Sequence, residues 1–181
     1  MDRGYLGQSM PGPVFLRGDR LSLRTVESDD YEFLRRQFNA PEVRHGIAGT
    51  EPMSADDLEG WLGGDDVISF LPCTSDGPVG FVWLFDIDDV ADRAELGYWI
   101  HPDERGVGYG TRAARLAVRY AVSERGLRKV SARVFETNDA SRTILERIGF
   151  EREGRLRDHY FVDGERVDAF LYGLLASEWG P

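Results

Sequence analysis

Three alternate glycines stand between a strand-like run and a long helix-like run, in the segment Arg-Gly-Val-Gly-Tyr-Gly-Thr at residues 105–111. Glycine lets a backbone approach a ligand without a Cβ atom, and the start of a helix offers free N–H groups and a partial positive charge to an anion. Residues 105–133 contain eight basic residues and one acidic residue, in a chain whose formal net charge is −10. Together these features predict a site for a phosphate-rich ligand.

Two common phosphate-binding motifs do not fit this segment. A Walker loop needs a lysine directly after its last glycine, and no lysine lies here. A dinucleotide fingerprint needs Gly-x-Gly-x-x-Gly directly after a strand, and Thr111 stands where the third glycine belongs. General binding of nucleic acid needs a broad basic face, which the acidic composition argues against.

The elements that must position the glycine segment follow from periodicity and from start and stop signals. Strands are expected at 20–24, 67–72, 79–85, 93–101 and 128–136, and two more flank the hairpin turn Asp163-Gly164. Helices are expected at 28–40, closed by Pro41, and at 54–62, 108–124 and 138–148. This order predicts an α/β fold with a mixed, mostly antiparallel sheet of about seven strands and about four helices.

Composition favours a single domain. The chain has 181 residues, of which 41% are hydrophobic, and this is enough for one globular core. Residues 1–18 contain glycine and proline without a period, so we expect a flexible arm ahead of one domain at 19–181. No apolar run reaches the roughly 20 residues of a membrane span, no signal-peptide core is present, and Cys73 is the only cysteine. A cytoplasmic protein without a membrane anchor is expected.

Four motifs occur in a fixed order: Ala-Glu-Leu-Gly-Tyr-Trp-Ile at 94–100, the glycine segment, Glu-Thr-Asn-Asp-Ala-Ser at 136–141 and Ile-Gly-Phe at 148–150. With them, residues 19–178 resemble the GCN5-related N-acetyltransferase (GNAT) superfamily, and most of all its branch of ribosomal-protein N-terminal acetyltransferases (RimJ/RimL-like). The resemblance implies the GNAT fold, with the sheet splayed between strands 4 and 5. It also implies transfer of acetyl from acetyl-coenzyme A (acetyl-CoA) to a primary amine, without a metal.

The same resemblance implies where acetyl-CoA binds. The backbone N–H groups of residues 106–111 would wrap the pyrophosphate, and the strand end at 99–101 would pair with the pantetheine arm. Asn138 either contacts that arm or simply caps the next helix, and Arg112 either attracts the 3′-phosphate or belongs to a solvated helix face. The implied cofactor-binding residues are Trp99, Ile100, His101, Arg105, Gly106, Val107, Gly108, Tyr109, Gly110, Thr111, Arg112 and Asn138.

The reaction needs a base for the amine and an acid for the leaving thiolate. Glu95, in the middle of a strand beside the expected splay, is the candidate base, and an ion-paired strand glutamate is the competing interpretation. The family's usual acid is a tyrosine seven residues after the asparagine, but Leu145 stands there. The candidate acid is therefore Ser141, three residues after Asn138, with Tyr160 as a weaker substitute.

The acceptor stays open between a protein N-terminal α-amine, a polyamine and an amino-bearing small molecule. Acidic residues at 56–59 and 86–89 suit a cationic acceptor, although a generally acidic surface explains them equally well. The absence of the usual tyrosine leaves a second class open, a GNAT-fold sensor or interaction module that binds coenzyme A without catalysis. A homodimer paired through the last strand is a further expectation.

Overall fold

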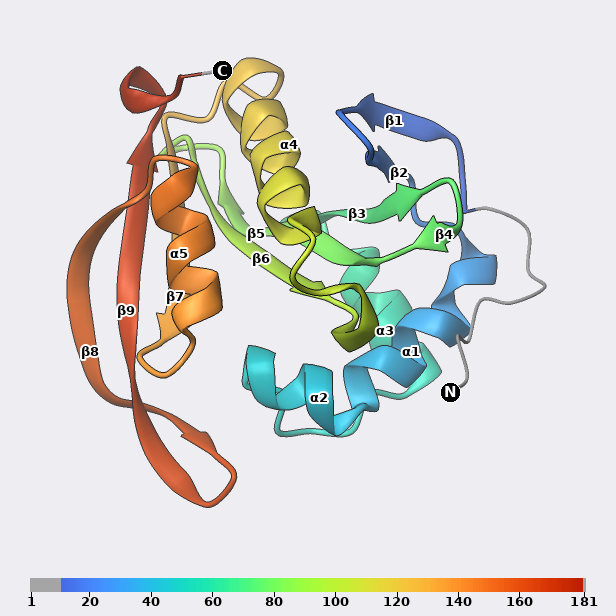
Figure 1. Cartoon of the computed structure of the whole chain (residues 1–181), viewed down its shortest axis with the longest axis horizontal. Helices are drawn as coiled ribbons and strands as arrows, with labels where there is room; N and C mark the ends of the chain where they lie inside the picture. Colours follow the sequence, from blue (N-terminus) through green and yellow to red (C-terminus); the bar gives the residue numbers. More distant parts are fainter. Residues whose placement is uncertain (1–10, 181) are drawn as a thin grey trace.

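The computed structural model describes residues 11–180, and one open sheet runs through the centre of this part of the chain (Figure 1). Its strands are β1 (Val14–Arg17), β2 (Ser22–Arg24), β3 (Ile68–Thr74), β4 (Gly77–Pro78), β5 (Gly80–Asp88), β6 (Arg93–Ile100), β7 (Lys129–Phe135), β8 (Glu151–Val162) and β9 (Glu165–Leu175). The strand order is β1-β2-β3-β5-β6-β7-β9-β8, with β4 paired to β3. Every pair is antiparallel except β6 with β7.

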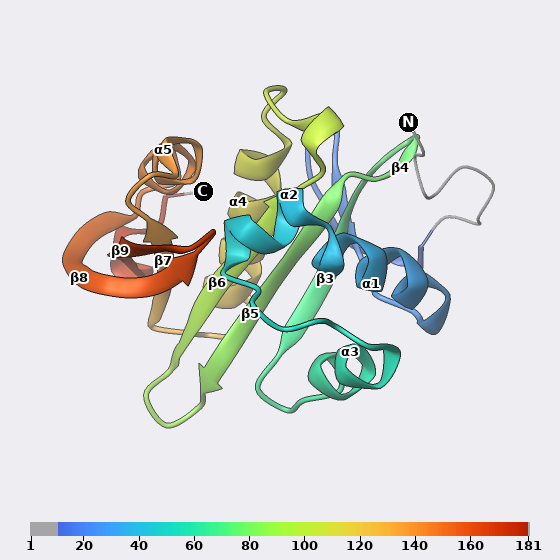
Figure 2. The same ribbon diagram turned by 90° about the horizontal axis from the view of Figure 1, so that it is seen from below.

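Helices cover both faces of this sheet. They are α1 (Tyr31–Asn39), α2 (Pro41–Arg44), α3 (Ala55–Leu62), α4 (Tyr109–Ser123) and α5 (Asp139–Arg147). Figures 1 and 2 show α4 and α5 on one face and α1 to α3 on the other. None of these helices is long and apolar enough to cross a membrane.

The side chains of β5 show how the sheet separates two hydrophobic cores. Val82 and Leu84 point into the core that contains Ala117 of α4, whereas Phe81 and Trp83 point into the core that contains residues of α1, α2 and α3. Successive strand residues face opposite sides of a sheet, so a strand covered on both faces is apolar throughout. The mixed α/β fold predicted from the order of elements is confirmed.

The parallel pair β6–β7 is short. Its register contains only three partners, from Arg93 with Lys129 to Glu95 with Ser131. Beyond Glu95, β6 continues to Ile100 without pairing to β7, while β7 stays paired with β9 as far as Phe135. The expected splay between the fourth and fifth predicted strands is therefore confirmed, and it leaves one edge of β6 open.

Two strands lie where none was predicted. Residues 1–10 of the expected arm lie outside the described residues, but Val14–Arg17 form β1 and pair with β2, and Leu16 is buried. The other addition, β4, contains only two residues of the predicted turn. Segments of two to four residues are too short for a period, so their ladder partners decide whether they become strands.

Pro41 closes α1 as predicted, but it also opens a helix of its own. It is the first residue of α2, a helix of four residues. Proline suits this position, because the first residue of a helix needs no N–H donor and proline already has a helical φ. The break therefore turns the chain instead of ending the helical region, and this gives the structure a fifth helix.

Candidate functional site

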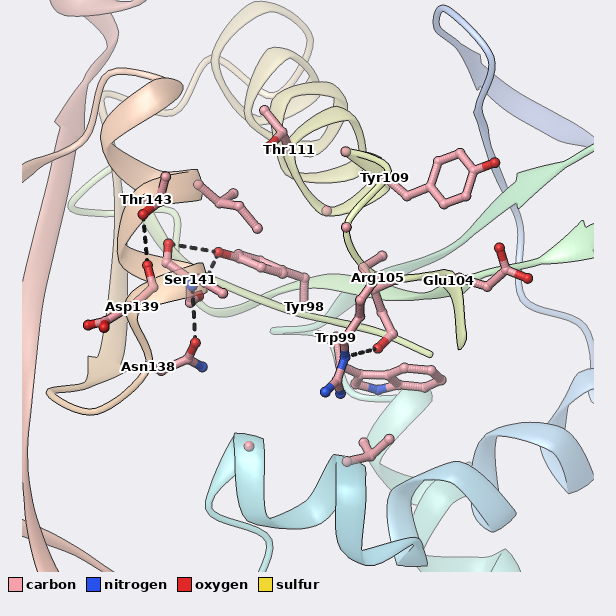
Figure 3. A pocket seen from close by; sticks show the side chains of 18 of the residues that line it. Tyr98, Trp99, Glu104, Arg105, Tyr109, Thr111, Asn138, Asp139, Ser141 and Thr143 are labelled. Atoms are coloured by element: carbon pink, nitrogen blue, oxygen red, sulfur yellow. Dashed lines mark hydrogen bonds between the residues drawn. The ribbon is translucent and has the colours of Figure 1, made fainter. Parts of the chain in front are cut away.

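A cavity of about 590 Å³ lies beside the open edge of β6. Its walls come from α2 and the turn after it, the end of β6, the glycine segment, the first turn of α4 and one side of α5 (Figure 3). Ten of the predicted site residues line it: Trp99, Ile100, Arg105, Gly106, Gly108, Tyr109, Gly110, Thr111, Asn138 and Ser141. The structure thus brings together most of the residues that the sequence motifs suggested.

The glycine segment enters α4 through two left-handed backbone positions. Gly106 has φ 84° and Gly108 has φ 87°, values that residues with a side chain rarely adopt. Gly108 caps α4, and no side chain caps the free N–H groups of the first turn. These donors have no acceptor within the helix, so the mouth of the cavity can hold an anion through the backbone.

The third glycine, Gly110, is needed for close packing and not for a left-handed backbone. A Cβ added to Gly110 would lie 2.9 Å from Cδ1 of Ile144 and 3.5 Å from Cγ1 of Ile100. Gly110 lies within α4 without a left-handed φ and is buried, so its missing side chain lets α4 pack closely on α5. Two of the alternate glycines therefore serve backbone conformation, and the third serves helix packing.

Arg105 ties the two walls of the cavity together. Its Nε donates to the Ile100 carbonyl at 3.0 Å, and its Nη2 donates to the Glu42 carbonyl at 3.3 Å. The first contact holds the end of β6, and the second holds α2 on the opposite wall. The guanidinium group therefore stabilises the shape of the cavity while it adds positive charge to it.

Three predicted cofactor residues do not line this cavity. His101 caps the next turn, where its Nδ1 accepts from the Asp103 N–H at 3.3 Å. Val107 is 58% exposed at the tip of the loop. Arg112 donates from Nη1 to the Val107 carbonyl at 3.0 Å, so its guanidinium lies over the outside of the glycine segment.

The rest of the arginine stripe on α4 makes similar contacts. Arg115 donates to the Arg147 carbonyl, and Arg119 donates to the Arg17 carbonyl, both at 3.4 Å. Each guanidinium thus joins α4 to a neighbouring segment. These contacts fit the interpretation of the stripe as a solvated helix face with structural ties.

A second cavity, of about 330 Å³, lies on the other side of the splay. Aromatic rings of Trp83, Phe85, Phe135 and Tyr160 form much of its wall. Five residues line both cavities and mark where the two meet: Gly46, Ile47, Tyr98, Asn138 and Ser141.

Glu95 lines the second cavity as half of an ion pair. The Arg133 Nε donates to both carboxylate oxygens, at 2.8 and 3.0 Å, and the Glu95 side chain is only 12% exposed. This contact is the main cause that raises the pKa of Arg133, so the guanidinium stays charged. The ion-paired interpretation of Glu95 is confirmed, and its role as the base stays a prediction that its place in the cavity wall allows.

Tyr98 is the site residue that sequence reasoning missed. Its Oη lies 2.7 Å from Oγ of Ser141, and desolvation of the half-buried ring raises the pKa of the phenol well above its ordinary value. The Asn138 side chain accepts from the Ser141 N–H at 3.0 Å, which confirms Asn138 as the cap of α5. Tyr98 belongs to the Gly-Tyr-Trp-Ile motif, but its partner stands 43 positions along the chain.

Two other positions considered from sequence for the acid, Leu145 and Tyr160, line the second cavity but not the first. Leu145, where a tyrosine was expected, is 1% exposed and is part of the core between the sheet and α4 and α5. Tyr160 lines the second cavity, with its ring edge-on to Phe135 at 5.0 Å between centroids. Burial raises the pKa of Tyr160, and Arg133 acts against that effect. Tyr160 thus lies on the side of Glu95 and Arg133.

The first cavity has the donors and the open strand edge that acetyl-CoA requires. The free N–H groups at the start of α4 suit phosphate, and the unpaired stretch of β6 suits an extended amide chain. Trp99 lines the same cavity, and its buried Nε1 has no hydrogen-bond partner within residues 11–180. A bound ligand or an ordered water would satisfy such a donor. Over the same residues, no group of three or more His, Cys, Asp or Glu side chains is placed to hold a metal ion.

Comparisons with known proteins agree with this geometry. The family model of the acetyltransferase (GNAT) domain matches residues 20–151. Ribosomal protein uS5-alanine N-acetyltransferase of Escherichia coli (strain K12) is 28% identical over 186 residues, which cover 93% of this chain and 94% of that protein. Spermidine N(1)-acetyltransferase of the same strain is 36% identical over 107 residues.

Some of these matches are partial. The chain spans 58% of the length of the spermidine enzyme and 55% of the length of YdaF from Bacillus subtilis (strain 168), to which it is 40% identical over 100 residues. Among solved structures, spermidine N-acetyltransferase from Vibrio cholerae in complex with CoA and spermine superposes with a TM-score of 0.83, at 24% identity over 89% of this chain and 98% of that one. That likeness supports the fold.

Proposed function

The chain belongs to the GNAT acetyltransferase family and is an acetyl-CoA-dependent N-acetyltransferase, and from this premise we propose that its acceptor is the α-amine of a protein N-terminus. The first cavity would hold acetyl-CoA, which supplies an acetyl group activated as a thioester. The second cavity would hold the acceptor. The five residues shared by both cavities mark the place where the two substrates meet.

Backbone groups would supply most of the hydrogen bonds to acetyl-CoA. The free N–H groups of Gly108 to Thr111 would hold the phosphates, and Arg105 would add positive charge beside them. The unpaired edge of β6 next to Trp99 and Ile100 offers N–H and C=O groups to the amides of the pantetheine arm. Asn138 borders that arm from α5 while it caps the helix.

The charge balance of the second cavity carries the choice of acceptor. Glu95 is the only carboxylate among its described lining residues, and Arg133 already pairs with it. Burying several ammonium groups without carboxylate partners is costly, so this cavity does not suit a polyamine. One amine attached to a short apolar side chain suits it well, because the remaining wall is largely aromatic.

The acidic residues that suggested a cationic acceptor lie away from this cavity. Those of α3 do not line it, and Asp88 and Asp89 are paired with Arg93 and Arg125. Asp86 lies 3.8 Å from the Arg133 guanidinium and so adds a second negative charge beside that arginine, but it does not line the cavity. The acidic clusters are therefore better described as surface charge than as an acceptor site.

Glu95 is our candidate base. Arg133 occupies one direction at each carboxylate oxygen, so lone pairs remain for the acceptor nitrogen or for a bridging water. Glu95 would accept the proton that the nitrogen loses, and Arg133 would hold the carboxylate in place. Ser141, at the meeting point of the cavities, would donate to the sulfur on the other side.

The relatives support one further candidate. By its name the uS5-alanine enzyme acetylates an alanine of a ribosomal protein, and an alanine offers only an α-amine, whereas the 36% identity to spermidine N(1)-acetyltransferase favours a polyamine. The lining of the second cavity, whose one carboxylate is already paired with Arg133, supports the N-terminal amine. A coenzyme A sensor without catalysis would instead bind coenzyme A and release no thiol from acetyl-CoA.

An acceptor screen tests the proposal. Peptides with free N-terminal alanine, serine or methionine are compared with the same peptides carrying a blocked α-amine and an internal lysine, and with spermidine and spermine. Thiol release and mass spectrometry should show acetylation of α-amines only. Turnover confined to polyamines would overturn the assignment, and binding without any turnover would favour the sensor.

A further inference from the structure

We propose that Tyr98 is a positioning residue, which holds the Ser141 hydroxyl as a hydrogen-bond donor to the sulfur that leaves during acetyl transfer. This inference rests on the proposed function. It assigns to β6 a phenol whose usual place in the family, position 145, is occupied here by a buried leucine. The hydroxyl that meets the sulfur is therefore that of Ser141 on α5, and the phenol that positions it comes from the strand β6.

The contact between the two hydroxyls is short and well defined. The Tyr98 Oη lies 2.7 Å from the Ser141 Oγ and 3.3 Å from the Ser141 carbonyl oxygen. Figure 3 shows the Tyr98 ring reaching across from β6 to the first turn of α5. The Asn138 cap fixes the Ser141 backbone from the other side, so the serine is held at both its N–H and its hydroxyl.

The position of this pair is what links it to the sulfur. Tyr98 and Ser141 carry the only hydroxyl groups among the described residues that line both cavities. The bond that breaks must lie where a ligand in the first cavity meets an acceptor in the second. The pair is therefore placed at the scissile thioester, while Tyr160 borders the second cavity alone.

Either hydroxyl is able to donate in this contact, and the proposal assigns the donor role to Tyr98 because a phenol O–H is a stronger donor than an alcohol O–H. When Tyr98 donates to Oγ, the Ser141 O–H is free to donate into the cavity, and the two bonds strengthen each other. Because burial raises the pKa of the Tyr98 phenol, it remains a donor throughout the working pH range. Ser141 would then present a polarised O–H to the developing thiolate.

The step balances without another reactant. The amine nitrogen forms a bond to the acetyl carbon, and the carbon–sulfur bond breaks with its electron pair on sulfur. The nitrogen loses one proton toward Glu95, directly or through water, and the sulfur gains one proton through solvent. Tyr98 and Ser141 stabilise the negative charge on sulfur by hydrogen bonds, and both keep their own protons at the end.

A double-mutant cycle tests whether Tyr98 acts through Ser141. Tyr98→Phe should lower kcat about 10-fold with little change in the KM for acetyl-CoA, which is the effect of weakening a hydrogen bond to a charged group. Ser141→Ala should lower kcat at least as much, and the double variant should be no slower than Ser141→Ala. Tyr120→Phe, which removes a phenol outside both cavities, should keep the wild-type kcat.

Binding of coenzyme A gives a second readout that does not depend on turnover. The ratio of the affinities for coenzyme A and acetyl-CoA, measured by calorimetry, should rise about 5-fold between about pH 7 and about pH 9.5, because only coenzyme A forms a thiolate. Tyr98→Phe and Ser141→Ala should flatten this rise. Titration of the other ionisable groups at the cavities changes the affinities for both ligands alike, so it does not change their ratio. These groups are Glu42, Glu95, Glu104, Arg105, Tyr109, Arg133, Asp139, Arg147 and Tyr160.

The outcomes separate this inference from the proposed function. A wild-type protein that acetylates no amine would end the proposed function itself. An active wild type with an unchanged Tyr98→Phe variant, or with losses that multiply in the double variant, would overturn the role of Tyr98 alone. A Tyr98→Phe variant that raises the KM for acetyl-CoA and keeps the pH-dependent ratio would show a merely structural role.

Discussion

The two cavities that meet at Tyr98 and Ser141 are built in opposite ways. The first depends mainly on backbone, since one continuous segment, 105–111, supplies its glycine turn and the open start of α4. The second depends on side chains from β5, β6, β7, α5 and β8, together with the turn after α2. The glycine wall of the first cavity is local in sequence, although the lining of that cavity as a whole extends from Glu42 to Arg147. The second cavity has no such local wall, and its lining is assembled from elements spread over 115 positions, from Gly46 to Tyr160.

This difference explains how a family can keep one co-substrate and change the other. Backbone N–H groups at a helix start bind phosphate whatever side chains surround them, so the cradle tolerates variation. Side chains that line an acceptor cavity can change charge and shape without disturbing that cradle. We therefore expect substitutions in the two regions to affect different kinetic constants.

The largest effect should come from the acceptor side. Glu95→Gln keeps the shape of the side chain but removes its capacity to take a proton, so kcat should fall about 100-fold or more. The KM for acetyl-CoA should stay near its wild-type value. Asp86→Asn is the matched control, because Asp86 also approaches Arg133 but does not line the cavity. Equal losses in both variants would mean that the charge of Arg133, and not proton transfer, is what matters.

The next largest effect should be a loss of folding stability from a substitution at Gly110. Gly110→Val adds bulk where a Cβ alone would already lie 2.9 Å from Ile144, so overpacking should lower the free energy of unfolding by about 1–3 kcal/mol. Urea denaturation measures this loss. Combining the change with Ile144→Ala should recover part of it, and a failure to recover would show that Gly110 matters for binding instead of packing.

A substitution at Gly108 should affect the first cavity and leave the second unchanged, the reverse of the effect expected at Glu95. Gly108→Ala forces a residue with a side chain to adopt φ 87°, which costs about 1–2 kcal/mol and disturbs the start of α4. The KM for acetyl-CoA should rise about 10-fold, while the KM for the acceptor should change little. Gly60→Ala, at an α3 glycine whose added Cβ would meet nothing within 4 Å, is the control. A rise in the acceptor KM alone would contradict the division between the cavities.

The smallest effect is expected at Arg112. Its guanidinium donates to the Val107 carbonyl and does not line the first cavity, so Arg112→Ala should raise the KM for acetyl-CoA by less than about 3-fold. The comparison uses acetyl-CoA with and without its 3′-phosphate. A loss of more than about 10-fold that disappears with the dephosphorylated substrate would restore Arg112 as a phosphate ligand.

Some parts of the site could be predicted because they depend on neighbours in the chain. The conformation of Gly106 and Gly108, and the Asn138 cap on the Ser141 N–H, each involve residues within a few positions. The helices and long strands have periods that extend over many residues. Such features were recovered with small errors at the ends, and the exceptions were very short elements such as β1 and β4.

Other parts could not be predicted, because they join residues far apart in sequence. Arg133 reaches Glu95 across 38 positions, and Tyr98 reaches Ser141 across 43. Neither contact leaves a pattern in the chain, since each depends on how β6, β7 and α5 pack. For the same reason the sequence could not show that Gly110 packs against Ile144 while Gly106 and Gly108 shape the turn.

By itself the sequence determined the family fold, the glycine turn at the start of α4 and the chemistry that a thioester and an amine require. These features depend on local backbone preferences and on motifs whose residues are close together in the sequence. Only the tertiary structure decided that Glu95 is paired, that Tyr98 partners Ser141 and that the second cavity is nearly neutral. The physical reason is that packing of a splayed sheet brings distant side chains within hydrogen-bond distance, and a hydrogen bond depends on distance in space and not along the chain.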